Sequence, residues 1–322
     1  MKGTLLFWIL WSSCAGLSVE VSDGQGSEGK VGILVTAHGG GPDWNAAVEA
    51  AVAPLREVCP IAVAFGMADP VSLGNGIRRL ESAGVRRIAV VRLFVSAESF
   101  RHQSEYFLGV RPDPPERFLL HPGHQEGAEL RTMKRGSAAA PLLISSREHS
   151  MAPVQKAASL ILNREGLYDS SVSGQIILER VRGLSANPEE ESILILAHGE
   201  GDERSNDRWL AKMDHLAGRI RAWGPFATVR VETLREDWKP QRGRAERRIR
   251  RFVEERSGRG EKVIVVPFRV FGFGPYKQVL AGLDYVANGR GLLPHPAITE
   301  WIRRQAGQCF RRAGWNDPFQ PG

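Results

Sequence analysis

The chain has 322 residues, of which 42% are hydrophobic and 25% charged, the composition of a globular protein with one large domain or two of ordinary size. This composition excludes a mainly disordered or fibrous protein. The 43 basic and 36 acidic residues give a formal charge of +7, an excess that fits an anionic ligand without establishing nucleic-acid binding. The three cysteines include no C-x-x-C pair, which excludes a disulfide scaffold and a structural zinc site built on cysteines.

Residues 1–25 have the pattern of a secretory signal peptide. Lys2 precedes the apolar run 5–11, and small residues at 13–15 offer a cleavage site. The run is too short to span a bilayer, and no other segment is long enough. Cys14 is an alternative site of lipid attachment, although Trp11 fits that pattern poorly; another alternative is an apolar N-terminal helix. We therefore expect an exported protein, periplasmic or extracellular, whose mature chain has no membrane span.

Cleavage would leave two cysteines, Cys59 and Cys309, one in each half of the chain. They would pair only if the fold brought their positions together, and the sequence leaves this open.

The chain contains an internal repeat. The segment 31–39 returns as 192–199, and each copy is an apolar run of strand length that ends in Ala-His-Gly. In both halves a helical pattern follows, then a second strand, a second helix and a third strand. The expected elements are the helices around 44–55, 69–84, 209–220 and 245–253, and the strands 31–37, 61–65, 87–95, 192–197, 227–231 and 262–270.

The strands are continuous apolar runs, which indicates burial on both faces and hence parallel sheets. The sequence therefore predicts an α/β protein of two similar domains, each a parallel sheet flanked by helices. We place the first domain at 29–148, the second at 151–305 and a tail at 306–322. Residues 109–140 are expected to be loop, 157–162 helical, and 169–191 to contain a further helix.

The helix expected at 245–253 lies within an arginine-rich segment, 242–256. A basic nucleic-acid helix is one interpretation, but Glu246, Glu254 and Glu255 interrupt the basic run. A solvated helix surface is the simpler interpretation, and we expect no nucleic-acid partner.

Both Ala-His-Gly sequences follow strands, and ligands of open α/β sheets bind beyond the carboxyl ends of the strands. His38 and His198 are therefore candidate functional residues. Gly39 and Gly40 let the backbone turn and let a flat or anionic ligand approach closely. Neither G-x-G-x-x-G nor a P-loop lysine accompanies them, which gives nucleotide binding little support.

The third strand of the first half leads into a second group of candidates, Glu98, His102 and Glu105. A neutral imidazole is both a metal ligand and a base that works near pH 7. Two histidines and a carboxylate from neighbouring strand ends would suit a divalent metal. On spacing alone, a pair of helix-capping or surface histidines is the favoured interpretation.

Four features together resemble the CbiX-like sirohydrochlorin chelatases, which are class II tetrapyrrole metal chelatases, in a tandem two-domain form. These are the strand that opens into Ala-His-Gly, the segment 84–91, the strand end at 93–96 and the histidine shortly after it. The resemblance covers roughly 32–109 and 192–283. It implies that His38 and His102 bind the metal and help take protons from the pyrrole nitrogens, with Glu105 as acidic helper and Glu98 as its competitor.

This sequence departs from the family pattern in three places. Gly40 stands where serine is usual, and the approach to His102 lacks the common glycine-rich run. In the second half, Lys277 occupies the position that matches His102, and a protonated lysine is a poor metal ligand. The resemblance therefore implies a degenerate second domain that closes a cleft over the first site. Lys277 is a candidate for binding substrate carboxylates.

The function that this resemblance implies is a lyase that inserts Co²⁺, Fe²⁺ or Ni²⁺ as a substrate into a carboxylate-rich tetrapyrrole, as in cobalamin biosynthesis. Imidazole ligands suit several of these metals, so the sequence does not choose among them. Export favours two alternatives on the same fold: a metal- or tetrapyrrole-binding protein without catalysis, and an interaction module. The sequence does not define the oligomeric state.

Overall fold

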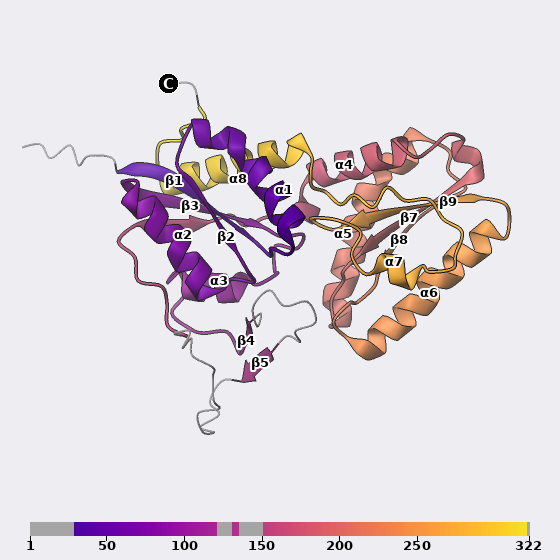
Figure 1. Cartoon of the computed structure of the whole chain (residues 1–322), viewed down its shortest axis with the longest axis horizontal. Helices are drawn as coiled ribbons and strands as arrows, with labels where there is room; N and C mark the ends of the chain where they lie inside the picture. Colours follow the sequence, from indigo (N-terminus) through magenta and orange to yellow (C-terminus); the bar gives the residue numbers. More distant parts are fainter. Residues whose placement is uncertain (1–28, 121–130, 135–150, 321–322) are drawn as a thin grey trace, which may run out of the picture.

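The computed structural model describes residues 29–120, 131–134 and 151–320. The predicted signal segment 1–25 lies outside the described residues. Two parallel sheets form the body of the molecule, and an antiparallel hairpin of β4 (Arg117–Leu120) and β5 (Arg131–Lys134) stands beside the first (Figure 1).

The first sheet has the strand order β2–β1–β3–β6, and all pairings are parallel. Its strands are β1 (Lys30–Ala37), β2 (Ile61–Phe65), β3 (Val85–Leu93) and β6 (Ser159–Leu162). The second sheet repeats the order of the first three strands as β8–β7–β9, from β7 (Glu191–Ala197), β8 (Thr228–Thr233) and β9 (Lys262–Phe268). The predicted α/β fold with two parallel sheets is confirmed.

Eight α-helices cover these sheets in the part of the chain that the structure describes. They are α1 (Pro42–Val52), α2 (Pro70–Ser82), α3 (Arg101–Phe107), α4 (Ser171–Arg182), α5 (Glu203–Trp223), α6 (Lys239–Ser257), α7 (Tyr276–Val279) and α8 (Pro296–Ala313). The start of α2 follows the expectation: the Asp69 carboxylate accepts a hydrogen bond from the Ser72 amide at 2.7 Å, and Pro70 takes the first helical position. The helix expected within 169–191 is α4.

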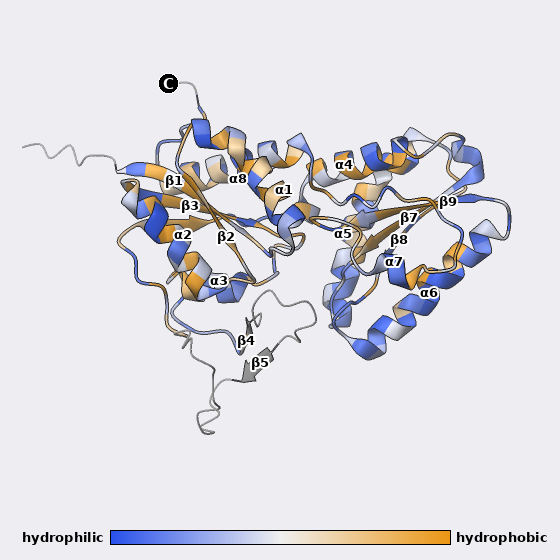
Figure 2. Ribbon diagram, viewed as in Figure 1, coloured by the Kyte–Doolittle hydropathy of each residue, from blue (hydrophilic) through white to orange (hydrophobic). Residues whose placement is uncertain are grey.

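Burial on both faces explains the continuous apolar strands. In β1, alternate residues such as Ile33 and Leu34 enter different cores, one on each side of the sheet. The strands of both sheets are hydrophobic, whereas α6 is hydrophilic along most of its length (Figure 2). Only four residues of α6 are buried, Ala245, Ile249, Phe252 and Val253, so its arginine-rich remainder is a solvated helix surface.

One apolar core runs through both domains. It joins one face of the first sheet to α1 and α8, continues through α4, and ends between α5 and one face of the second sheet; its members include Ile33, Val48, Trp301, Ile176, Met213 and Ile195. Because this core is continuous, the two domains pack directly against each other.

The domain boundaries differ from the prediction in two places. Residues 159–162 form β6 of the first sheet and not a helix of the second domain. Residues 306–313 belong to α8, whose side chains pack against β3 of the first sheet, so they are core and not tail. Periodicity cannot distinguish a four-residue strand from a helical turn, and no sequence pattern reveals that the last helix returns to the first domain.

The remaining cysteines are free thiols, and both are buried. Burial raises the pKa of the Cys59 thiol to about 12 and that of Cys309 to about 11, so both are held in the neutral form. Among the residues described, no helix is both long and apolar enough to cross a membrane.

The place of α8 in the first-domain core predicts the effect of Trp301→Ala. Trp301 is fully buried, so the substitution should lower the free energy of unfolding by about 3–5 kcal/mol. Urea denaturation followed by circular dichroism measures this. Trp223→Ala is the control, because Trp223 is 37% exposed and its loss should cost less than about 1 kcal/mol. Equal effects of the two substitutions would contradict the packing of α8 described above.

Candidate functional site

The two Ala-His-Gly turns are built alike. In the first, the Nδ1 atom of His38 lies 2.8 Å from the carbonyl oxygen of Gly39, and in the second the Nδ1 atom of His198 lies 2.9 Å from that of Gly199. The two glycines have φ angles of 75° and 83°, in the left-handed region that L side chains rarely adopt. The repeat therefore extends from the sequence to the orientation of the imidazole rings.

An asparagine holds each turn from the helix that follows. The side-chain oxygen of Asn45 accepts from the Gly40 amide at 3.1 Å, and that of Asn206 accepts from the Glu200 amide at 3.2 Å. Asn206 also accepts from the Thr233 hydroxyl at 2.8 Å, which ties the second turn to the end of β8. These contacts fix both histidines at the carboxyl edges of their sheets.

The hydrogen bond to the glycine carbonyl decides which tautomer each histidine adopts. A carbonyl oxygen can only accept, so Nδ1 carries the hydrogen and Nε2 presents its lone pair in the neutral ring. This is the arrangement that a metal-binding imidazole commonly has, with the second nitrogen oriented by a backbone carbonyl.

Aromatic rings join the first histidine to the second domain. Trp44, on α1, stacks on His38 with ring centroids 5.5 Å apart and an angle of 19° between the planes. It also stacks on Phe271, which follows β9, with centroids 6.0 Å apart. The carboxyl edges of the two sheets therefore meet at α1, between the two domains (Figure 1). We call the residues His38, Trp44, His198, Asp237 and Phe271 the interdomain site.

His198 has a partner that the sequence did not reveal. Its Nε2 atom lies 3.1 Å from a carboxylate oxygen of Asp237, in the connection between β8 and α6. Burial lowers the pKa of His198, but the hydrogen bond to Asp237 and the charges of Glu236 and Asp237 outweigh it and leave the pKa above its ordinary value.

Asp237 links the two histidines electrostatically. The hydrogen bond from His198 lowers the pKa of Asp237 most; burial opposes it, and the charges of His198, His38 and Arg269 lower it further. The charge of His38 therefore reaches a carboxylate of the second domain.

Further carboxylates surround His198. Glu200 stands where the first domain has Gly40, directly after His-Gly, and burial raises its pKa against the charge of His198. Glu236 forms an ion pair with Arg269, whose guanidinium also lies 5.6 Å from the Tyr276 ring. The second domain thus carries an acidic group around His198.

His102 lies on α3, above the carboxyl edge of the same sheet as His38. The next residue, Gln103, donates to the carbonyl oxygen of Met67 at 2.8 Å and so fastens α3 to the connection after β2. The Nε2 atom of His102 lies 3.3 Å from the Asp113 carbonyl oxygen. Arg92, buried in β3, donates to the carbonyl oxygens of Ala97 and Ser99 and so orders the segment that leads into α3.

The acidic candidates near His102 are engaged with arginines. Glu105 is 19% exposed and lies 2.8 Å from Arg101 and 3.8 Å from Arg111. Glu98 is 63% exposed and lies 3.6 Å from Arg101. Both carboxylates of this group therefore face cations.

Neighbouring side chains of the protein occupy the space beside Gly39 and Gly40. A Cβ atom on Gly39 would lie 3.0 Å from Phe65, and one on Gly40 would lie 2.7 Å from the Trp44 ring. Lys277 is exposed on α7. The close packing at Gly39 and Gly40 explains both residues without a ligand.

Within residues 29–120, 131–134 and 151–320, no group of three or more His, Cys, Asp and Glu side chains is placed to hold a metal ion.

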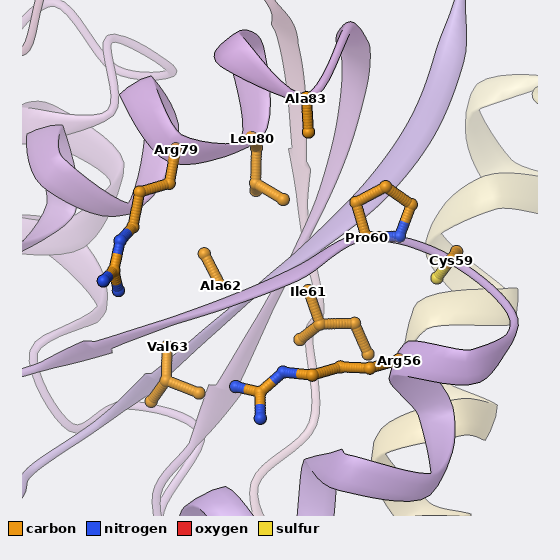
Figure 3. A pocket seen from close by; sticks show the side chains of 9 residues that line it. All are labelled: Arg56, Cys59, Pro60, Ile61, Ala62, Val63, Arg79, Leu80 and Ala83. Carbon is orange, nitrogen blue, oxygen red and sulfur yellow. The ribbon is translucent and has the colours of Figure 1, made fainter.

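The surface of the described part of the chain is hollowed in at least two places. One, of about 450 Å³, opens beside the amino end of β2, and its lining includes Arg56, Cys59 and, from α2, Arg79 (Figure 3). The other, of about 520 Å³, lies beyond the carboxyl end of β3, between Glu98 and Arg164 of the first domain and Tyr168, Arg208 and Lys212. Ligands of open α/β sheets bind at carboxyl ends, so the second cavity is the better placed of the two to receive a ligand.

No protein-family model matches this sequence, and no curated protein matches it at a significant level. Among solved structures, the fold is similar to that of SirB from Bacillus subtilis with Fe³⁺, at a TM-score of 0.56 and 12% identity, over 89% of this chain and 99% of that one. The sirohydrochlorin chelatase SirB from Bacillus subtilis subspecies spizizenii in complex with cobalt gives a TM-score of 0.54 and 10% identity, over 88% and 97%.

DR2241 from Deinococcus radiodurans, a multi-domain protein described as structurally similar to chelatases, gives a TM-score of 0.50 and 17% identity, over 87% of this chain and 55% of that one. At these identities the likeness concerns the fold. This chain has the chelatase fold that the Ala-His-Gly strands predicted.

The His198–Asp237 pair predicts a measurable pKa change. Asp237→Asn removes the carboxylate that raises the pKa of His198 and leaves the burial that lowers it, so the pKa should fall below its value in the unmodified protein. A histidine whose pKa is higher in the folded protein than in the unfolded chain stabilises the fold. This contribution is complete at pH values below the pKa in the unfolded chain, and it is lost as the pH rises through the pKa in the folded protein. Titration of the imidazole proton resonances by NMR measures the change. An unchanged pKa in the variant would show that Asp237 does not control His198.

Proposed function

We propose that this protein inserts a divalent metal ion, Co²⁺, Fe²⁺ or Ni²⁺, into a carboxylate-rich tetrapyrrole of the sirohydrochlorin type. The observation that carries the proposal is the orientation of His38. Its Nδ1–H is committed to the Gly39 carbonyl, so Nε2 carries the lone pair at the carboxyl edge of a chelatase-like sheet. The likeness to the two SirB structures supports the same proposal.

In this proposal His38 and His102 hold the incoming metal through their ring nitrogens. Nitrogen atoms of the macrocycle complete the coordination as water leaves, and imidazole ligands suit each of the three metals. The basic side chains of the cavity beyond β3, Arg164, Arg208 and Lys212, would face the carboxylates of the tetrapyrrole. Lys277 is a further candidate for that contact.

A metal- or tetrapyrrole-binding protein without turnover is the second candidate. The ion pairs of Glu105 with Arg101 and Arg111 favour it, because they engage the acidic helper that was expected beside His102. Metal uptake without a faster metalation rate would identify this function.

The test of the metal ligands compares three substitutions. Loss of a residue that only orients a metal ligand weakens metal binding by about 10–100-fold. His38→Ala and His102→Ala would remove ligands, so each should weaken Co²⁺ binding by more than this. His215→Ala is the control, because His215 is exposed on α5. Isothermal titration with Co²⁺ measures binding, and circular dichroism checks folding. Affinity should also fall from about pH 7.5 to about pH 5, since a protonated imidazole cannot coordinate. Unchanged affinity in either variant would exclude that histidine as a ligand.

We also propose that the chain is exported and processed before about residue 20, on the basis of its apolar segment and the small residues after it. Expression in a bacterial host followed by fractionation and intact-mass measurement tests this. A shortened chain in the periplasm is expected. Full-length chain in the cytoplasm would contradict export, and retention on the membrane with a lipid-modified Cys14 would favour the anchored form.

A further inference from the structure

The outer strand of the first sheet, β2, has one edge that is not paired within the described part of the chain. On its other edge β2 pairs with β1 in parallel register. The Gly66 amide, just after β2, donates to the Ala37 carbonyl oxygen of β1 at 3.0 Å, so the even-numbered residues turn their backbone groups toward β1. Because backbone groups alternate along a strand, those of Ile61, Val63 and Phe65 point off the unpaired edge.

The other outer strands in the described residues are each protected. β8 carries the charged pair Arg230 and Glu232, and its Val229 carbonyl oxygen accepts from Arg221 at 3.2 Å. β9 exchanges backbone hydrogen bonds with Val286, and β6 is only four residues long. Charged side chains, covering segments and short strands are devices by which proteins prevent edge-to-edge pairing of sheets.

The internal repeat shows what β2 lacks. β2 pairs with β1 in the same register as β8 pairs with β7, so each residue of β2 has an equivalent in β8. By this register Ala62 and Ala64 of β2 stand where β8 has Arg230 and Glu232. The second domain therefore has a charged edge at the place where the first has a small, apolar one.

The cavity of about 450 Å³ lies along the unpaired edge. Ala62 lies on the side of Arg79, and Ile61 and Val63 lie on the side of Arg56 (Figure 3). Ile61 and Val63 pack against the apolar core but remain partly exposed. An apolar edge with unpaired N–H and C=O groups is a template for a further strand.

We propose that this edge binds the same edge of a second copy of the protein, as an antiparallel pair about a two-fold axis at Val63. Val63 would lie opposite its own counterpart, and Ile61 would lie opposite Phe65. All three residues point their backbone groups off the edge, so each would exchange its N–H and C=O hydrogen bonds with the residue opposite. The two four-stranded sheets would form one continuous sheet across a self-complementary interface.

The charges beside the edge favour a second copy as the partner. Arg56 and Arg79 line the cavity at the amino end of β2. Asp69 follows the carboxyl end of β2, and Asp43 lies in the first turn of α1, which begins at that same end of the sheet. In an antiparallel pair the amino end of one strand lies beside the carboxyl end of the other. The arginines of each copy would therefore face the aspartates of the other.

Exposed apolar side chains stand at both ends of β2. Val58, just before the strand, is 51% exposed, and Val71, just after it, is 46% exposed. In the antiparallel pair, Val58 of one copy and Val71 of the other would come to the same end of the interface. Both would then lose apolar surface to the partner, which stabilises the pair.

Sedimentation velocity of the purified full chain tests the proposal. A dimer is expected at about 10–100 µM protein. Val63→Lys should raise the dimer dissociation constant by about tenfold or more, because two like charges would lie opposite each other at the axis. Val231→Lys is the matched control, since Val231 is the equivalent residue of β8, and it should leave the dimer intact. Circular dichroism checks that both variants fold.

Val63→Cys tests the register with a milder substitution, in case the lysine variant does not fold. Opposite residues of a hydrogen-bonded antiparallel pair have Cα atoms about 5.5 Å apart, a distance that a disulfide spans. Oxidation should therefore join two chains of this variant covalently. Val231→Cys is the control and should stay unlinked; the buried Cys59 and Cys309 are common to both variants.

Three results would overturn the inference. One is a monomer at every concentration up to about 100 µM, which would leave the edge free for a different protein. Another is a dimer that persists unchanged in folded Val63→Lys, because the interface would then lie elsewhere. The third is a Val63→Cys protein that dimerises without forming the covalent link, which would exclude the antiparallel register. Each result is read from molecular mass, so it does not depend on the proposed chelatase function.

Discussion

The continuous apolar core between the two sheets is the constraint on which the interdomain site depends. Trp301 and Phe310 of α8 pack into the first sheet, and α4 and α5 continue the same core to the second. Burial of this much apolar surface disfavours separation of the domains. Two strand ends that are 160 residues apart in the chain (His38 and His198) are therefore held close enough for one ring stack to connect their domains.

Aromatic and polar contacts add to the apolar core in holding the two domains together. Trp44 stacks on both His38 and Phe271, so an imidazole of one domain is in contact with an aromatic residue that also contacts the other domain. Arg180 donates from α4 to the carbonyl oxygens of Gly291 and Pro294, and His295 pairs with Glu179 at the start of α8. These bonds fix the path by which the chain returns to the first domain.

The histidine turns of the two halves have the same hydrogen bonds, but the charged groups around them differ. Both histidines donate Nδ1–H to the next carbonyl oxygen, and both turns are fastened by an asparagine. In the first domain the carboxylates near His102 face arginines, whereas in the second Asp237 faces a histidine. The repeat therefore keeps its geometry and changes its electrostatics.

The sequence by itself determined the fold class, most element positions and the two histidine turns. Continuous apolar strands require cover on both faces, Asp69-Pro70 begins a helix, and Ala-His-Gly marks a carboxyl strand end; each of these signals is local. Only the tertiary structure decided that β6 and α8 complete the first domain and that Asp237 pairs with His198. Asp237 lies in a connection without a motif, 39 residues after its partner, and its importance comes from the meeting of the ends of β7 and β8. Pairings of this kind depend on which strands lie side by side, and no local pattern in the sequence encodes that.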